Sequence, residues 1–340
     1  FNQFKFENIK FSIFVNDKFI NEKYVNLDLN FPDIEFRKYI IEKFPRCANR
    51  DGSIDINSPY IRSCDTIVIN NYNIQDITGI NYFENLKYLK IITKVKNVPK
   101  FPTSLESLII QNNLINLDEW NFPPELTYLH LNKVTFFKNN NIEIIVNLPS
   151  KIKSLILEDT NLGGINKFPP DIEYLSLSHF NSLNNLPSKL KSLKLSEIKN
   201  YNLSKLPDSL TTLDGYKIEQ IINLLPKNLE NLTLSKTNYL LPPLPENLKS
   251  LNIYDISAIY SPFPPKLETL KIYNGKIKAL PRLPENLKIL QLFNLENFIE
   301  INYLPNGLEN LYIFHSKIKI PKELPSGMKK FRVIGPINEE

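Results

Sequence analysis

Residues 280–293, LPRLPENLKILQLF, contain the pattern that decides the fold of this 340-residue chain. Pro284 is followed by apolar residues three, six and eight positions later, at Leu287, Leu290 and Leu292. The string (Leu/Phe)-Pro-x-x-(Leu/Ile/Met) occurs twelve times, at intervals of 18 to 26 residues. Its prolines are Pro102, Pro123, Pro149, Pro169, Pro187, Pro207, Pro226, Pro245, Pro264, Pro284, Pro305 and Pro325. So regular a period indicates a repeat protein, whose length counts stacked units rather than domains.

Each repeat predicts one short strand and one return segment. The alternating apolar residues give a strand with one buried face. The proline disfavours a helix, so we expect an extended or polyproline-like return. A unit this short cannot bury a core alone, and stacked units form a curved parallel β-ladder with a continuous apolar spine. Two earlier units keep the rhythm without the proline, at Ile67/Ile69 and at Leu86/Leu89/Ile91.

This spine resembles that of leucine-rich-repeat proteins, and especially the short bacterial Leu-Pro-x-Leu-Pro-x-x-Leu-x-x-Leu repeats found in effectors. Residues 280–290 fit that pattern fully, and residues 241–251 fit it with one extra residue. The resemblance implies a leucine-rich-repeat solenoid of about 14 units over residues 65–335. One position departs from the family, which usually carries a buried asparagine three residues after the last strand leucine. Here it holds Asn113 once, and then Val134, Thr160, Phe180, Ile198, Ile218, Thr237 and Ile256, which predicts apolar packing and a looser turn.

The chain before residue 65 reads as an N-terminal cap. Residues 31–44 predict an amphipathic helix, with Asn30 as its cap and Pro32 early in its first turn. The order FPDIEFRKYI (31–40), DGSI (51–54) and ITGINYFENL (77–86) resembles the cap of bacterial internalin-like surface proteins. Those proteins are typically exported and bind partners on host or neighbouring cells. We therefore expect a cap over 31–64, a β-hairpin-like unit over 1–30 and a short tail over 336–340.

Cys47 and Cys64 are the two cysteines of the chain, and both fall in the cap. Their position predicts a disulfide that braces the end of the solenoid, with two buried free thiols as the alternative. A disulfide would imply an oxidising, exported setting. The first residue, Phe1, fits a chain from which a signal peptide has been removed.

The DGSI segment also raises the question of calcium, because in internalin-like proteins it often lies in a calcium-loop-like stretch. In that register the ligands would be Cys47, Asn49, Asp51 and Ser58. This set lacks both the leading aspartate and the final bidentate acid of such a loop. We therefore expect a tight polar turn and no metal site.

Composition and motifs argue against several classes of function. The chain is 42% hydrophobic and 23% charged, so it can fold, and it has no apolar run long enough for a membrane span. Its net charge of +5 is not gathered into a Lys/Arg stripe, so we expect no nucleic acid partner. His130, His179 and His315 belong to different units, and no phosphate-binding loop or metal motif occurs. We expect neither an enzyme nor a cofactor.

Residues five, seven and nine positions after each proline should lie on the exposed concave face, because they alternate with the buried spine. In the C-terminal half they form an aromatic stripe beside polar residues. The predicted partner-binding residues are Tyr216, Tyr254, Tyr273, Phe293, Tyr312, Phe314, Lys271, Gln291 and Asn252. Such a patch favours partner recognition. Aromatic residues also suit strands, however, and can stack across a ladder without any ligand.

These features predict a non-enzymatic protein-recognition module, most simply an exported bacterial surface or secreted protein that binds a host or neighbouring-cell protein. One alternative is an intracellular scaffold or translocated effector without a catalytic domain, in its own or a host cytosol. Similar spines in amoebae and giant viruses keep this alternative open. A third interpretation is a carbohydrate-binding adhesin that uses the aromatic stripe.

Overall fold

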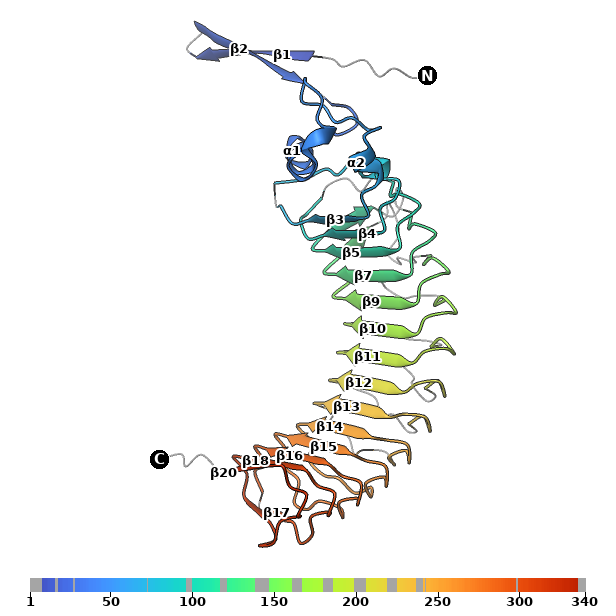
Figure 1. Ribbon diagram of the computed structural model, residues 1–340, viewed down its shortest axis with the longest axis vertical. Helices are drawn as coiled ribbons and strands as arrows, with labels where there is room; N and C mark the ends of the chain where they lie inside the picture. The colour runs from blue at the N-terminus through green and yellow to red at the C-terminus, as the bar shows by residue number, and fades with distance from the viewer. Residues whose placement is uncertain are drawn as a thin grey trace. The chain divides into compact units, whose positions relative to one another are not determined.

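In a computed structural model the chain forms two compact units: unit 1 is Phe1–Ile152 with Asp159–Leu162, and unit 2 is Lys153–Glu158 with Gly163–Glu340. The structure describes residues 8–15, 18–26, 28–71, 73–95, 100–116, 121–137, 147–160, 167–179, 186–198, 206–218, 225–236, 241, 243–297 and 299–335. The predicted tail at 336–340, and Phe180 and Thr237 of the turn position, lie outside these residues. In each unit, parallel strands follow one another in sequence order (Figure 1).

Unit 1 holds the cap and the first repeats. It begins with an antiparallel pair, β1 (Asn8–Val15) and β2 (Lys18–Asn26). The helices of the cap are α1 (Ile34–Lys43), the 3₁₀ helix η1 (Pro45–Cys47), α2 (Pro59–Arg62) and, further on, the 3₁₀ helix η2 (Ile80–Tyr82). The parallel strands are β3 (Thr66–Ile69), β4 (Tyr88–Ile91), β5 (Ser107–Gln111) and β7 (Tyr128–Asn132). A short parallel pair, β6 (Leu114–Asn116) and β8 (Thr135–Phe137), follows the last two of them.

Among the described residues of unit 2, ten parallel strands form one sheet and no helix occurs. The strands are β9 (Ser154–Glu158), β10 (Tyr174–Ser178), β11 (Ser192–Ser196), β12 (Thr212–Tyr216), β13 (Asn231–Ser235), β14 (Ser250–Tyr254), β15 (Thr269–Tyr273), β16 (Ile289–Phe293), β18 (Asn310–Phe314) and β20 (Lys330–Ile334). A two-residue pair, β17 (Ile299–Glu300) and β19 (Ile318–Lys319), lies on the return segments.

Each proline of the pattern begins a tight turn that leads into the strand. In all twelve repeats its carbonyl oxygen accepts a hydrogen bond from the N–H three residues later, at 3.0–3.5 Å. For example, the Pro245 carbonyl oxygen accepts a hydrogen bond from the Leu248 N–H at 3.1 Å, and β14 begins two residues after that leucine. In the first eleven repeats the spine positions six and eight residues after the proline are buried, as Leu251 and Ile253 are in β14. The strand position predicted from the repeat is confirmed.

A residue with positive φ directly follows the strand in most repeats, ten positions after the proline. In eleven repeats φ lies between 46° and 57°, and none of these residues is glycine: Asn112, Lys133, Asp159, His179, Glu197, Lys217, Lys236, Asp255, Asn274, Asn294 and His315. An L-residue adopts this left-handed conformation at a cost of about 1–2 kcal/mol. Its N–H commonly donates to the carbonyl that ends the next strand, as from Asn274 to Phe293 at 2.9 Å. These inter-repeat bonds offset the strain without glycine.

The residue four positions after the proline forms a ladder of alternating charge in unit 2, which we call the charge ladder: Glu230, Lys249, Glu268, Lys288, Glu309 and Lys329. Ion pairs join Lys249 to Glu230 at 3.0 Å, Lys288 to Glu268 at 3.0 Å and Lys329 to Glu309 at 2.9 Å. Because these side chains are largely exposed, each pair contributes at most about 1 kcal/mol. The ladder nevertheless fixes which charge each repeat presents to its neighbour.

Gly215 occupies a spine position that holds a large apolar residue in the neighbouring strands. A Cβ at Gly215 would overlap the Ile218 Cδ1 atom and would lie 3.1 Å from Leu234 Cδ2. Ile218 therefore fills, from the following turn, the space that a spine side chain fills elsewhere. The other described apolar residues at this turn position, Val134, Ile198 and Ile256, are buried as well and contribute to the core.

The cap helix differs from its prediction at the N-terminus. α1 begins at Ile34 rather than residue 31, and its N-cap is Asp33 rather than Asn30. Asp33 Oδ1 accepts hydrogen bonds from two N–H groups of the first turn, at 2.9 Å each. Its Oδ2 accepts from the N–H groups of Gln75 and Asp76, at 2.8 and 2.9 Å. One carboxylate therefore caps the helix and joins it to the first repeats, which the amide of Asn30 could not do.

The two cysteines for which a disulfide was predicted lie unbonded in the cap. Cys47 and Cys64 are both buried and both free. Cys64 Sγ lies 3.4 Å from the Thr66 carbonyl oxygen, to which it donates. Burial raises the pKa of both thiols, so neither is an activated nucleophile. The alternative of two buried thiols describes this cap.

Candidate partner-binding face

The predicted partner-binding residues lie on one face of unit 2, on strands β12, β14, β15, β16 and β18. Strand alternation puts the residues five, seven and nine positions after each proline on this face, where they are half-buried beside the buried spine. We call the predicted set the recognition face: Tyr216, Asn252, Tyr254, Lys271, Tyr273, Gln291, Phe293, Tyr312 and Phe314. The in-register pairing of the strands aligns these residues in columns.

Four aromatic rings of the recognition face form a continuous stack. The centroid separations are 4.6 Å between Tyr254 and Tyr273, 4.9 Å between Tyr273 and Phe293, and 4.7 Å between Phe293 and Phe314. The interplanar angles are 7°, 19° and 7°. These separations equal the spacing of adjacent strands, about 4.8 Å. The rings therefore cover one another's faces, and each contact stabilises the ladder by about 0.5–1.5 kcal/mol.

Cations border the aromatic residues, and the sequence interpretation did not include them. Lys217 and Lys236 lie over the Tyr216 ring, 5.3 and 5.7 Å from its centroid. Arg332 lies 5.5 Å from the centroid of Phe314. The two lysines occupy the left-handed position after their strands, which no sequence signal marked as close to the rings. Such contacts favour cation–π interaction at these two rings.

A polar column runs beside the stack. Asn252 Nδ2 donates to Thr233 Oγ1 at 3.2 Å, and the Tyr273 hydroxyl donates to Gln291 Oε1 at 3.1 Å. Lys271 pairs in register with Asn252 on one side and Gln291 on the other. Burial raises the pKa of Tyr273, and Tyr254 beside it raises it further, so this hydroxyl remains a donor at neutral pH. Among the described residues, Asn252 Oδ1 is buried without a hydrogen-bond partner.

Asp214 is the acidic residue of this polar column. It pairs in register with Lys194 on one side and Thr233 on the other. Burial raises the pKa of its carboxyl, and the Lys194 ammonium offsets only part of that rise. The folded chain therefore holds a carboxylate where a neutral group would be more stable.

We expect Asp214→Asn to raise the melting temperature slightly at pH 7. A carboxyl whose pKa is raised on folding binds protons more readily in the folded state, so the native chain gains stability as the pH falls. The advantage of the variant should therefore shrink toward pH 4, near the pKa of about 3.9 of an unfolded aspartate. Calorimetry at both pH values measures this, with the exposed Asp208→Asn as control. A variant less stable than the native chain at pH 7 would contradict it.

The segment considered for calcium is a tight polar turn. Asp51 Oδ1 accepts hydrogen bonds from the N–H and hydroxyl of Ser53 at 3.0 and 2.7 Å. Asn49 Nδ2 donates to the same hydroxyl at 2.9 Å, and Gly52 has φ of 84°. Nowhere in the described part of the chain do three or more His, Cys, Asp or Glu side chains gather in an arrangement able to hold a metal ion.

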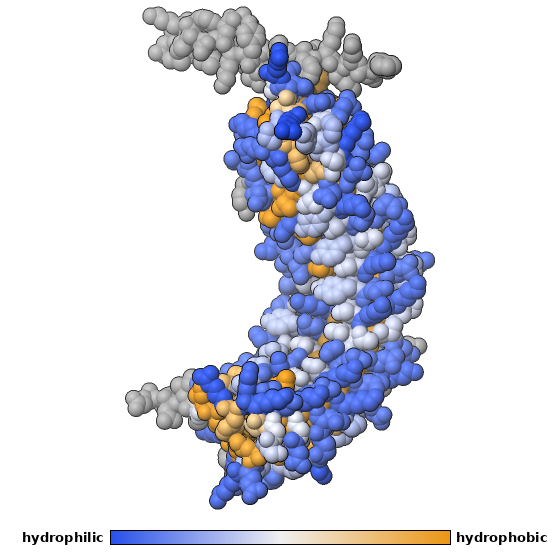
Figure 2. Space-filling model, viewed as in Figure 1, coloured by the Kyte–Doolittle hydropathy of each residue, from blue (hydrophilic) through white to orange (hydrophobic). Residues whose placement is uncertain are grey.

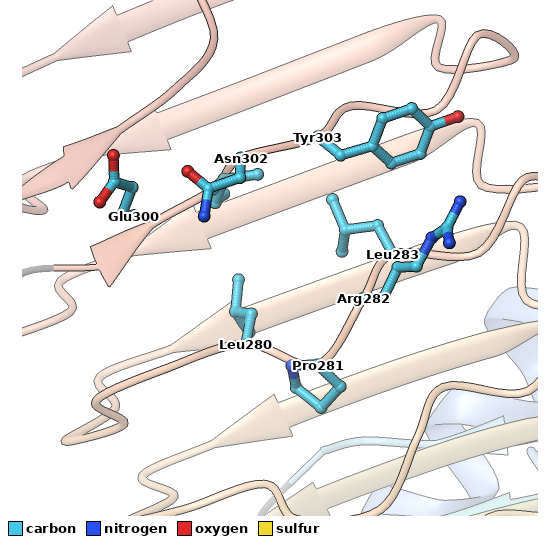
Figure 3. Close-up of a pocket in the computed structure, with 8 residues that line it drawn as sticks. Leu280, Pro281, Arg282, Leu283, Glu300, Asn302 and Tyr303 are labelled. Carbon is cyan, nitrogen blue, oxygen red and sulfur yellow. The ribbon is translucent and has the colours of Figure 1, made fainter.

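A shallow pocket of about 190 Å³ lies on the return segments, lined by residues 280–283 and 300–303 (Figure 3). Two polar residues of its rim, Arg282 and Tyr303, contact each other and Glu285. The Tyr303 hydroxyl donates to Glu285 Oε2 at 2.6 Å, and Arg282 lies 5.3 Å from the Tyr303 ring and 3.3 Å from Glu285. The volume is below the roughly 300–1,000 Å³ of sites that enclose a small molecule.

The histidines take separate structural positions. His130 lies on β7, and His179 Nε2 is 3.3 Å from Glu197 Oε2. His315 Nδ1 is buried without a hydrogen-bond partner among the described residues. No helix in the described ranges combines the length and apolar character needed to cross a membrane.

No protein-family model matches this sequence, and no curated protein matches it. Several solved structures are similar, and three of them are described here. YopM from Yersinia enterocolitica WA-314 is 24% identical, with 75% of this chain and 64% of that chain covered and a TM-score of 0.47. CroV588, described as a novel circular LRR protein, is 20% identical, with 74% and 47% covered and a TM-score of 0.50. YopM from Yersinia pestis, described as a leucine-rich effector protein, is 18% identical, with 81% and 89% covered and a TM-score of 0.38.

The first two matches are longer than this chain, which spans less than two thirds of either. The likeness to CroV588 concerns the fold, and it agrees with the parallel strands and the buried leucine spine. Together these observations confirm the predicted fold class.

Proposed function

We propose that this leucine-rich-repeat solenoid is a non-enzymatic protein-recognition module that binds its partner through the recognition face. The observation that carries the proposal is the ordered four-ring stack beside a column of amide and hydroxyl groups. Rigid aromatic side chains next to adaptable polar ones are typical of protein-binding surfaces.

A protein partner suits this face better than a carbohydrate. Sugars pack against the open faces of aromatic rings, whereas the rings from Tyr254 to Phe314 cover one another at 4.6–4.9 Å. What remains half-exposed is a row of ring edges with polar groups beside it. Edges of this kind fit apolar side chains and main-chain groups of a protein.

The finer identity that we propose is a bacterial protein with an internalin-like cap. The residues that carry that resemblance lie together: Phe31 contacts Tyr82 with ring centroids 6.0 Å apart, and the Tyr82 hydroxyl donates to Asn30 Oδ1 at 2.7 Å. Gly79 lies directly against Phe31. These contacts support the motif as one structural unit.

Two placements of such a protein are distinguished by the thiols of the cap. An exported surface or secreted adhesin predicts oxidised cysteines, whereas an intracellular scaffold or translocated effector predicts reduced ones. Alkylation of the unfolded chain without reductant, followed by intact mass measurement, separates the two. If both thiols are alkylated in protein taken from its native source, the compartment is reducing. If neither thiol is alkylated, the cysteines are oxidised and the result supports export.

Binding through the recognition face is tested with the triple variant Tyr254→Ser, Tyr273→Ser, Phe293→Ser. The immobilised chain is exposed to protein extracts and to a glycan array, and the bound partners are quantified. We expect the triple variant to capture at least tenfold less of the protein partner than the native chain, because it lacks the central rings. The matched control is the triple variant Lys249→Gln, Glu268→Gln, Lys288→Gln. It changes the charge-ladder residues of the same three repeats, and it should retain the partner.

The variant weakens the ladder, so circular dichroism and a cooperative melt must first show that it is folded. A folded triple variant that captures the same proteins to the same extent would place the binding site elsewhere. Selective binding to the glycan array, lost in the triple variant, would favour the carbohydrate-binding interpretation instead.

A further inference from the structure

Lys271 is a cation without a partner in the middle of the recognition face. It occupies the central position of β15, where it is half-buried and pairs in register with Asn252 and Gln291. Within the described part of the chain its ammonium makes no hydrogen bond and no ion pair. Partial burial weakens the hydration of a charge, and an opposite charge offsets that cost. A bound partner can supply the opposite charge at this position.

The strands around Lys271 carry no acid on this face. In β14, β15, β16 and β18 the positions five, seven and nine residues after the proline hold neither aspartate nor glutamate. Asp214 of the same column lies three strands away, about 14 Å at the usual strand spacing and beyond the screening length of about 8 Å in physiological salt. Glu268 of the same repeat already pairs with Lys288 at 3.0 Å, and Asp255 lies past the end of β14. The charge of Lys271 is therefore not balanced within the face.

Two further donors continue from Lys271 along the polar column. Gln291 Oε1 accepts from the Tyr273 hydroxyl at 3.1 Å, so the Nε2 group of that amide points elsewhere. Neither this Nε2 group nor the Tyr312 hydroxyl bonds to a residue that the structure describes. In-register pairing places Lys271, Gln291 and Tyr312 at the same position of three adjacent strands. We call these three donors the donor row.

A carboxylate matches the donor row better than a phosphate group does. It carries one negative charge against one ammonium, and its two oxygens can accept from Lys271 and from Gln291 at the same time. A phosphate group carries nearly two charges and three acceptor oxygens, and it favours a cluster of cations. Among the described face positions of β14–β18, Lys271 is the one cation. The donor row therefore favours an aspartate or glutamate side chain.

The ring stack determines what lies next to that acid. Tyr273 and Phe293 follow Lys271 and Gln291 by two residues on the same strands, which is about 6.6 Å. The half-exposed edges of these rings suit apolar side chains. Figure 2 shows apolar and hydrophilic residues side by side on the surface of the C-terminal repeats. A complementary segment thus carries an acidic residue with apolar residues beside it.

We propose that the recognition face binds a protein segment in which an acidic side chain, flanked by apolar side chains, pairs with the donor row. The carboxylate accepts from Lys271 Nζ and Gln291 Nε2, with the Tyr312 hydroxyl beside them. The apolar side chains cover the ring edges of Tyr273 and Phe293. This inference rests on the proposed function of the face and adds the chemistry of the partner. Charge complementarity of this kind supplies specificity more than affinity.

The first test selects peptides from a random library displayed on phage, with the native full chain and with Lys271→Glu as baits. We expect the native chain to select peptides with aspartate or glutamate beside apolar residues. Lys271→Glu should select lysine or arginine at that place, because the sign of the charge is reversed. The matched control Lys266→Glu makes the same change of charge on an exposed turn of the same repeat, and it should still select acidic peptides.

The second test is a double-mutant cycle on one peptide from the native selection. Its binding to the native chain and to Lys271→Met is measured by fluorescence anisotropy, before and after its acidic residue is replaced by the corresponding amide. The replacement should weaken binding to the native chain at least tenfold and binding to Lys271→Met less than twofold. Equal losses would show that the acid does not contact Lys271, and they would overturn the proposal.

The remaining outcomes separate this inference from the proposed function. Native selections without an acidic residue overturn the inference, and the proposed function still stands if those peptides bind the triple aromatic variant at least tenfold more weakly. Peptides that bind the triple aromatic variant as they bind the native chain contradict the proposed function as well. A peptide with phosphoserine in place of the acid that binds at least tenfold more tightly would assign the donor row to a phosphate group and overturn the inference.

Discussion

Replacing Gly79 with alanine should unfold the cap at temperatures where the native cap is stable, with a loss of about 3 kcal/mol or more. Gly79 has φ of 105°, a conformation that L-residues rarely adopt. A Cβ at this position would lie 2.5 Å from the Asn30 carbonyl oxygen and 2.5 Å from the Phe31 ring. Both neighbours are fixed, because Phe31 is fully buried and contacts Phe36, Tyr82 and Phe83. Hydrogen exchange of residues 28–95 measures the loss locally.

Gly52→Ala is the matched control. Gly52 also has positive φ, at 84°, but nothing lies within 4 Å of a Cβ there. This substitution therefore isolates the backbone strain, about 1–2 kcal/mol, from the close contact. Equal losses in the two variants would mean that the contact between Gly79 and Phe31 contributes nothing.

Asp28→Ala should destabilise the cap by about 3 kcal/mol or more, because it leaves two buried backbone donors and one half-buried donor without a partner. Asp28 is 0% exposed. Its Oδ1 accepts from the N–H groups of Asn30 at 2.9 Å and Phe31 at 3.3 Å, and its Oδ2 accepts from Ile54 at 3.0 Å. One carboxylate thus joins the start of the cap to the turn at residue 54. Chemical denaturation monitored by hydrogen exchange of the cap is the measurement.

Two comparison variants sharpen this prediction. Asp28→Asn keeps one acceptor oxygen but turns an amide donor toward the Ile54 N–H or the Asn30 N–H, so its loss should be intermediate. Asp55→Ala removes an exposed carboxylate that accepts from Asn57 at 3.0 Å, and it should cost at most about 1 kcal/mol. If Asp28→Ala and Asp55→Ala were equally mild, the buried carboxylate would not support the cap.

The features of the fold that follow from local periodicity could be predicted from the sequence. Burial of residues such as Leu251 and Ile253 follows from alternation after each proline, and the same alternation places Tyr254 and Tyr273 on the opposite face. Because all repeats share one register, the columns of the recognition face could also be written down. The sequence left open whether the aromatic residues stack on one another across the ladder. They do, because adjacent strands are separated by the stacking distance of the rings.

Features that depend on contacts between distant segments could not be predicted. Asp33 caps α1 because it also accepts hydrogen bonds from Gln75 and Asp76, which lie far along the chain. In eleven repeats the left-handed position is occupied by asparagine, lysine, aspartate, glutamate or histidine, so no glycine marked it in the sequence. Ile218 fills the spine for Gly215 across a turn. The state of Cys47 and Cys64 depends on how the cap folds rather than on their separation in sequence.

The alternation of the charge ladder also constrains how this gene can lengthen or shorten. Deleting the single repeat that contains Lys249 would bring Glu230 beside Glu268, and duplicating it would bring two lysines together. Removing or inserting two adjacent repeats keeps every neighbour opposite in sign. The backbone of unit 2 has a period of one repeat, but the charge ladder has a period of two. We therefore expect unit 2 to tolerate the insertion or deletion of two adjacent repeats better than that of a single repeat.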